Sequence, residues 1–311
     1  MSSNGIAKTG KPDLSVEIAG VTFKNPVMTA SGTFGSGMEY SEFVDLNRLG
    51  AVVTKGVANV PWEGNPTPRV AEVYGGMLNA IGLQNPGIDV FIERDLAFLT
   101  QFDTKVIVNV CGHTEEEYLE VVERLADQPA DMLEINVSCP NVKQGAIQFG
   151  QDPKCLSEIT EKIKRIAKQP VIMKLTPKVT DIAEMARAAE AGGADAISLI
   201  NTITGMKIDI EKRRFVLANK TGGLSGPAIK PVAVRMVWQA AQAVKIPIIG
   251  MGGIASAEDA VEFMLAGATA VAVGAMNFHD PCLTVKVIDG IGQYLTRHSI
   301  AAAKELTGAV L

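Results

Sequence analysis

The chain is organised around one stretch, which reads Glu134-Ile135-Asn136-Val137-Ser138-Cys139-Pro140-Asn141. The largely apolar residues 131–137 predict a short buried strand, and Pro140 with the polar residues after it predicts that the strand ends in a loop. Cys139 is therefore expected just past the carboxyl end of a strand, among the amides of Asn136 and Asn141. A thiol in polar surroundings suits acid, base or nucleophilic chemistry, whereas a packing cysteine has apolar neighbours. We predict a chemical role for Cys139, with a packed thiol as the alternative.

On both sides of this segment, short apolar runs alternate with amphipathic stretches. Apolar runs predict buried strands at 26–30, 51–54, 105–110, 132–137, 171–175, 196–200, 247–250 and 270–274. Helical spacing predicts helices at 114–127, 153–168, 180–191, 231–244 and 256–266. Thr114 and Ser256 are candidate amino-terminal caps, because acidic residues follow each of them. Strands that alternate with helices indicate a parallel α/β fold.

Within that class, the sequence favours a TIM (β/α)8 barrel over a doubly wound sheet. The first strand lacks a Gly-x-Gly-x-x-Gly turn, and the alternation runs to the end without a domain break. We predict one barrel domain over residues 14–311, with a β-hairpin at 14–23 and a flexible arm at 1–13. Residues 56–86 and 201–227 show little helical period and are predicted to be long loops at the carboxyl face of the barrel.

Composition excludes several classes of protein. The 311 residues are 47% hydrophobic and 20% charged, which is ordinary for a globular enzyme with a sizeable core. A net charge of −5 without a basic patch argues against nucleic-acid binding. No signal peptide or membrane span is predicted, so a cytoplasmic location is expected. The four cysteines include no Cys-x-x-Cys pair, which argues against a metal site, an iron–sulfur site or a disulfide framework.

The chemistry of a barrel lies at the carboxyl ends of its strands, and these ends are unusual here. Lys55 and Lys174 each end an otherwise apolar strand; one such lysine is explained by a solvated terminus, but the two together favour function. Gly252-Gly253 and Gly274 follow the last two strands, where glycines let backbone N–H groups approach a phosphate. The three histidines are interpreted as surface or internally satisfied residues. Together these features suit a flavin, a carboxylated amide substrate and a thiol base, without a metal.

The sequence resembles the dihydroorotate dehydrogenase family, most closely the catalytic subunit of its class 1B form, from about residue 14 to residue 294. Four motifs carry the resemblance: Thr54-Lys55-Gly56, Asn79-Ala80-Ile81-Gly82-Leu83-Gln84-Asn85, Ile135 to Asn141, and Gly250-Met251-Gly252-Gly253-Ile254. The resemblance implies a TIM barrel that binds FMN and oxidises dihydroorotate to orotate in pyrimidine synthesis.

The resemblance also implies a role for individual residues. Cys139 would be the base that takes the C5 proton while the C6 hydride passes to FMN. The substrate would be held by Lys55, Asn79, Ala80, Ile81, Gly82, Leu83, Asn136, Asn201 and Thr202. FMN would be held by Ser31, Lys55, Gly56, Asn109, Asn136, Lys174, Ile200, Gly226, Gly252, Gly253, Gly274 and Ala275.

The subclass follows from finer features of the same motifs. Three segments are similar to class 1B, namely Thr54-Lys55-Gly56, Asn141-Val142-Lys143 and Gln148-Phe149-Gly150. Class 1A enzymes are similar but are homodimers that reduce fumarate. Class 1B implies a partner subunit that carries FAD and a 2Fe–2S cluster, a heterotetramer of two chains of each kind, and NAD as the final acceptor. Two departures are Ala146 in place of a usual glycine and Ala275 in place of a usual threonine. The second removes a hydroxyl near the phosphate, but the backbone donor remains and FMN binding is still expected.

Three other functions are compatible with parts of the pattern. A phosphate-binding lyase or isomerase would use Lys174 as a Schiff base. A flavin-binding or scaffolding subunit would contain Cys139 only as a packed thiol. A reductase of uracil-type bases would show no preference for the carboxylate of dihydroorotate.

Overall fold

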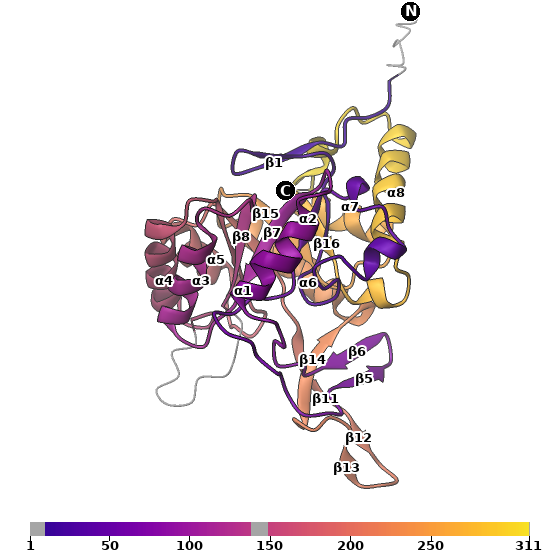
Figure 1. Ribbon diagram of the computed structural model, residues 1–311. Helices are drawn as coiled ribbons and strands as arrows, with labels where there is room; N and C mark the ends of the chain where they lie inside the picture. The colour runs from indigo at the N-terminus through magenta and orange to yellow at the C-terminus, as the bar shows by residue number, and fades with distance from the viewer. Residues whose placement is uncertain (1–9, 138–148, 311) are drawn as a thin grey trace, which may run out of the picture.

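The computed structural model describes residues 10–137 and 149–310, and its centre is a closed barrel of parallel strands (Figure 1). Each strand is largely buried and coincides with one of the predicted apolar runs. In order around the barrel the strands are β3 (Val27–Thr29), β4 (Ala51–Val53), β7 (Lys105–Val110), β8 (Met132–Asn136), β9 (Val171–Lys174), β10 (Ala196–Leu199), β15 (Ile248–Met251) and β16 (Ala270–Val273). Parallel pairing of β16 with β3 closes the ring. The predicted TIM-barrel fold is confirmed.

Helices cover the outside of the barrel. They are α3 (Glu115–Leu125), α4 (Pro153–Ile166), α5 (Ile182–Ala191), α6 (Lys230–Ala241), α7 (Ala257–Leu265) and α8 (Leu283–Arg297). In α4, Leu156, Ile159 and Ile163 share one buried face while Lys154 and Glu161 are exposed, so the helix packs by its apolar stripe.

The helix starts agree with the capping residues in the sequence. The Thr114 hydroxyl accepts a hydrogen bond from the N–H of Glu117, and the Ser256 hydroxyl accepts one from Asp259. Helical segments that were not predicted are α8 and the segment formed by α1 (Ile88–Val90), a π-helical turn (Phe91–Leu96) and α2 (Ala97–Leu99). Short 3₁₀ turns lie at Tyr40–Glu42, Leu46–Arg48, Pro227–Ile229, Ala275–Phe278 and Ala303–Leu306.

The two ends of the barrel carry different additions (Figure 1). At one end lies the predicted hairpin, β1 (Val16–Ile18) with β2 (Val21–Phe23). At the other end lies an antiparallel sheet of β5 (Val70–Val73), β6 (Gly76–Asn79), β11 (Ile203–Met206) and β14 (Thr221–Ser225), followed by the projecting hairpin of β12 (Ile208–Asp209) and β13 (Arg214–Phe215).

Residues 56–86 and 201–227 line the cavity at the carboxyl face of the barrel, as long loops there were predicted to do, but both segments also contain strands, which were not predicted. Their strands pair with each other across the molecule, as Asn79 does with Gly223 and Leu78 with Leu224. The glycine-rich sequence hides this pairing, since strand patterns depend on side chains that glycine lacks.

Two further predictions concern the flexible arm at residues 1–13 and the absence of a membrane-spanning segment. Asp13 forms a β-bridge with Ala302, but residues 1–9 lie outside the described part, so the division into arm and domain stays a prediction. Among the described residues, no helix has the length and apolarity needed to cross a bilayer.

Candidate active site

A cavity of about 420 Å³ lies where the carboxyl ends of the barrel strands face the antiparallel sheet of β5, β6, β11 and β14, which we call the second sheet. It contains every residue predicted to bind substrate or cofactor, although these residues come from distant parts of the chain. The predicted catalytic residue, Cys139, lies outside the described residues. The structure therefore brings the predicted binding residues together, and their individual roles remain proposals.

Inside the barrel, Lys174 belongs to a buried polar network. Its amine donates to Glu134 (3.1 Å to Oε1) and to the Ser31 hydroxyl (3.0 Å). Glu134 also accepts from the Asn109 amide (2.6 Å to Oε1) and the Ser198 hydroxyl (2.7 Å to Oε2). Burial of a charge is costly unless it is paired and hydrogen-bonded, and Glu134 meets both conditions. The network fixes Lys174 at the floor of the cavity.

Lys55 lies two residues after β4 and differs from Lys174 in its surroundings. Its backbone N–H donates to the carbonyl of Gly35 (2.8 Å). Among the described residues, no carboxylate forms an ion pair with its amine. Burial lowers the pKa of Lys55, the Cys111 thiol opposes this, and the positive charges of Lys174 and Arg69 lower the pKa further. An anionic ligand would supply the negatively charged partner that Lys55 does not have among the described residues.

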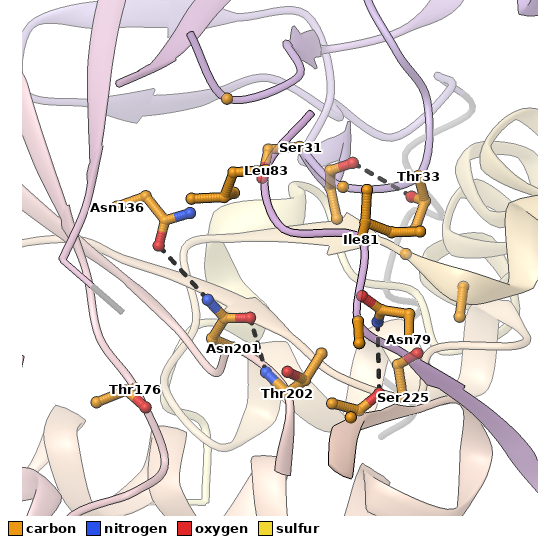
Figure 2. Close-up of a pocket in the computed structure, with 18 of the residues that line it drawn as sticks. Ser31, Thr33, Asn79, Ile81, Leu83, Asn136, Thr176, Asn201, Thr202 and Ser225 are labelled. Atoms are coloured by element: carbon orange, nitrogen blue, oxygen red, sulfur yellow. Dashed lines mark hydrogen bonds between the residues drawn. The ribbon is translucent and has the colours of Figure 1, made fainter. Parts of the chain in front are cut away.

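Three asparagines bring amide groups to the cavity from three elements. Asn136 ends β8, Asn79 ends β6, and Asn201 follows β10. The Asn201 amide donates to Asn136 Oδ1 (3.5 Å; Figure 2). The Asn79 amide donates to the carbonyl of Gly223 (3.4 Å). Both bonds are at the long limit for a hydrogen bond. These amides suit a ligand that carries carbonyl and N–H groups.

The residues after β15 form a cradle that only glycine permits. Gly252 and Gly253 have φ values of +128° and +83°. A Cβ at Gly252 would lie 2.8 Å from the Cβ of Ala233, and one at Gly253 would lie 2.8 Å from the carbonyl oxygen of Gly226. Side chains are therefore excluded here, and the bare backbone suits a phosphate group.

The cavity also matches the polar groups of a flavin. Asn109 Oδ1 is buried and has no hydrogen-bond partner among the described residues, so an acceptor is present for a ligand N–H. Lys174 adds a cation, and the glycine cradle adds room for a phosphate. These residues fit FMN. In the described ranges, no three His, Cys, Asp or Glu side chains group as metal ligands would.

Several residues that line the cavity were not identified from the sequence. His113 was interpreted as a surface or satisfied residue, but its ring stacks on that of Trp62 (centroids 3.9 Å apart) and both line the cavity. Thr176 and Lys178 also line it. Thr176 and Lys178 closely follow the β9 exit, which was a usable signal, whereas nothing in the sequence pairs residue 62 with residue 113.

Comparisons with known proteins agree with one another. The family model described as "Dihydroorotate dehydrogenase" matches residues 13–295. The chain is 71% identical over 296 residues to the catalytic subunit of dihydroorotate dehydrogenase B (NAD(+)) from Lachnoclostridium phytofermentans, covering 95% of this chain and 99% of that protein. It is 63% identical over 300 residues to the protein of the same name from Alkaliphilus metalliredigens, covering 96% and 99%.

The fold is also found in a solved structure. The crystal structure of DHODH from Eimeria tenella in complex with ferulenol matches with a TM-score of 0.80 and 24% identity, covering 97% of this chain and 90% of that chain. At this identity the likeness bears on the fold alone.

Proposed function

Since the chain belongs to the dihydroorotate dehydrogenase family, we propose that its cavity binds FMN and dihydroorotate together and that Cys139 acts as the base. The chain is an oxidoreductase that oxidises dihydroorotate in pyrimidine biosynthesis. This reaction removes a proton from C5 and a hydride from C6, and a C5–C6 double bond forms. The residues of the chain must therefore orient the substrate, accept the proton and support the hydride acceptor.

The environment of Lys55 is the observation that carries the proposed substrate site. Dihydroorotate is a cyclic amide with one carboxylate. The cavity offers several side-chain amides and the cation of Lys55, which forms no ion pair with a carboxylate among the described residues. Lys55 binds the carboxylate in this proposal, while Asn79, Asn136 and Asn201 bind the ring carbonyl and N–H groups. Residues 80–83 and Thr202 complete the binding surface. Charge-assisted hydrogen bonds of this kind are about twice as strong as neutral ones.

The proposed FMN site is formed by the floor of the cavity and the glycine cradle. When bound, FMN supplies the acceptor for the C6 hydride. Gly252, Gly253 and Gly274 offer backbone N–H groups to its phosphate, and Asn109 offers Oδ1 to a ring N–H. Lys174 would place a positive charge beside the bound ring and so would stabilise negative charge on it. The remaining predicted contacts are Ser31, Lys55, Gly56, Asn136, Ile200, Gly226 and Ala275.

Cys139 holds the C5 proton in this proposal, which is supported by the family resemblance and by its place three residues beyond Asn136. The thiolate accepts the proton as the C6 hydride leaves, so the ring gains no net charge from the two transfers. A serine hydroxyl is a far poorer base at neutral pH. Cys139→Ser should therefore reduce the reductive half-reaction strongly while leaving orotate binding in place. Unchanged turnover in this variant would remove Cys139 from the mechanism.

The electrons are proposed to leave through a second subunit. The relatives are named catalytic subunits of an NAD(+)-linked enzyme. We propose a partner that carries FAD and a 2Fe–2S cluster, in a heterotetramer of two chains of each kind, with NAD as the final acceptor. The alternative is a homodimer that passes its electrons to fumarate. A cytoplasmic location stays a prediction.

Anaerobic stopped-flow reduction of the purified chain tests these proposals in sequence. Dihydroorotate should bleach the flavin band of the FMN-loaded chain. Recovery of the band with fumarate alone would identify the homodimeric alternative, and recovery only with NAD and an iron–sulfur flavoprotein partner would support the proposed complex. Loss of activity on treatment with borohydride plus substrate would instead indicate a Schiff base at Lys174. Reduction by dihydrouracil as fast as by dihydroorotate would contradict a carboxylate site at Lys55.

A further inference from the structure

A buried asparagine behind the cavity wall connects several parts of that wall. Asn85 is 6% exposed. Its side-chain oxygen accepts from the N–H groups of Ala58 (3.1 Å) and Gly87 (2.9 Å), and its side-chain nitrogen donates to the carbonyl of Leu83 (2.9 Å). Its backbone exchanges two further hydrogen bonds with Trp62, each 3.0 Å long. One residue therefore joins two chain segments, residues 58–62 and its own residues 83–87.

Each of these segments carries a group that lines the cavity. Ala58 lies three residues after Lys55, and the Val57 N–H between them donates to the carbonyl of Asn109 on β7 (2.8 Å). Trp62 and Leu83 line the cavity themselves (Leu83 in Figure 2). The amide of Asn85 thus fixes the segment that follows Lys55 relative to the end of residues 79–83, and both groups line the same cavity.

The backbone conformation of residues 82–87 shows why the hydrogen bonds of Asn85 are needed. Leu83 has a φ of +54°, in the left-handed region that residues with a side chain rarely adopt. Gly82 (φ +75°) and Gly87 (φ +81°) flank the segment and also have positive φ values, which glycine adopts at no steric cost. A strained residue persists only where its surroundings hold it, and the amide of Asn85 holds the Leu83 carbonyl directly.

We propose that Asn85 is a positioning residue for dihydroorotate, which sets the spacing between Lys55 and the backbone of residues 79–83. This inference rests on the proposed function, in which those two groups bind different parts of the substrate. The role requires an acceptor for two N–H groups and a donor for one carbonyl, and an asparagine side chain supplies both. An aspartate keeps the acceptor, loses the donor and places negative charge against the Leu83 carbonyl.

The test compares FMN-loaded Asn85→Ala and Asn85→Asp with a matched control. Asn25 is also a buried asparagine (3% exposed) that accepts from Val27 N–H (3.1 Å) and donates to the Arg48 carbonyl (2.8 Å). It precedes β3, at the end of the barrel away from the cavity. Asn25→Ala should lower thermal stability but keep the orotate affinity and kcat/KM within about twofold per FMN-loaded molecule.

Both Asn85 variants should weaken orotate binding and lower kcat/KM for dihydroorotate by about 100-fold at unchanged FMN content, because a small misplacement of binding groups is costly in rate. For Asn85→Asp, the loss relative to wild type should shrink as the pH falls, because the protonated carboxyl regains a donor for the Leu83 carbonyl. Because affinity and kcat/KM are measured per FMN-loaded molecule, a loss of stability alone would not produce this recovery.

Two results would overturn the inference. One is an orotate affinity and kcat/KM within about twofold of wild type in the Asn85 variants, and the other is an equal loss in Asn25→Ala. If Asn85→Ala does not fold, Asn85→Asp and its pH profile decide alone. A wild-type chain that neither binds orotate nor is reduced by dihydroorotate would contradict the proposed function instead.

Discussion

Two lysines reach the same cavity from separate barrel strands, Lys55 after β4 and Lys174 at the end of β9, yet their surroundings differ. Lys174 is 4% exposed and forms an ion pair with Glu134 inside a network that also contains Ser31. Lys55 is partly buried, its pKa is lowered by that burial, and no carboxylate among the described residues pairs with it. The protein itself satisfies the first charge and leaves the second for a ligand. The difference separates a lysine whose charge is balanced within the protein from one that is proposed to select an anion.

Replacing Lys174 should have the largest effect on stability. Lys174→Met leaves Glu134 buried with an uncompensated charge, and breaking a buried pair in this way costs about 3–5 kcal/mol. Urea denaturation of the apo chain measures the loss. The double variant Lys174→Met, Glu134→Gln should recover much of it, because the charge is removed with its partner. A double variant no more stable than Lys174→Met would show that the ion pair does not carry the difference.

Replacing Lys55 should have the opposite profile. Lys55→Met should lower kcat/KM for dihydroorotate by about 100-fold, since a hydrogen bond to a charged group is worth about 1.5–3 kcal/mol. The free energy of unfolding should stay the same or rise, because the variant removes a partly buried charge that no carboxylate among the described residues balances. Steady-state kinetics and denaturation of the same preparation test both parts. A large loss of stability would mean that the two lysines are alike.

The pH dependence of orotate binding should sharpen the comparison further. Burial lowers the pKa of Lys55 below its ordinary value of 10.5, so the folded protein binds fewer protons than the unfolded chain between those two pKa values. The contribution of Lys55 to stability therefore rises with pH in that window. Orotate affinity should fall as the pH rises through the lowered pKa, because only the cation attracts the carboxylate.

Titration of the flavin band with orotate between neutral pH and pH values near 10.5 measures this effect. Lys55→Met should bind weakly at every pH in the range. A wild-type affinity that stays constant up to the ordinary pKa of lysine would contradict the assigned role of Lys55.

A third lysine should show the smallest effect. Lys178 is exposed at the cavity rim, where water and salt screen its charge. Lys178→Met should lower kcat/KM by no more than about threefold, and the difference should vanish at about 0.5 M salt. A salt-resistant loss as large as that of Lys55→Met would place Lys178 in direct contact with the substrate.

The barrel strands were predictable because burial on both faces leaves a plain apolar run, as at Ala51–Val53. The same logic placed Lys55 and Lys174 at strand ends. The second sheet was not predictable in this way, because β14 reads Thr221-Gly222-Gly223-Leu224-Ser225 and is specified by its partner strands rather than by its own pattern. Helix α8 did carry a signal, since Val287, Ile291 and Leu295 recur every fourth residue and are buried.

The site itself was predictable where residue type alone indicates chemistry. Pairings between distant residues, such as Trp62 with His113, follow only from the folded chain. Asn85 was visible as part of a motif, but its function as a tie between segments depends on hydrogen bonds that no sequence pattern shows.

The second sheet also bears on how the molecule is assembled. The Asn79 amide and the carbonyl of Gly223 are 144 residues apart in the chain, and β7, β8, β9 and β10 lie between them. Contacts of such long sequence separation form slowly, because the entropy of closing the loop is lost before the contact repays it. The barrel wall can grow from neighbouring units, whereas this sheet must wait for both of its halves. The binding cavity is therefore expected to be the last part of the protein to reach its native form, and its cofactor to be acquired late in folding.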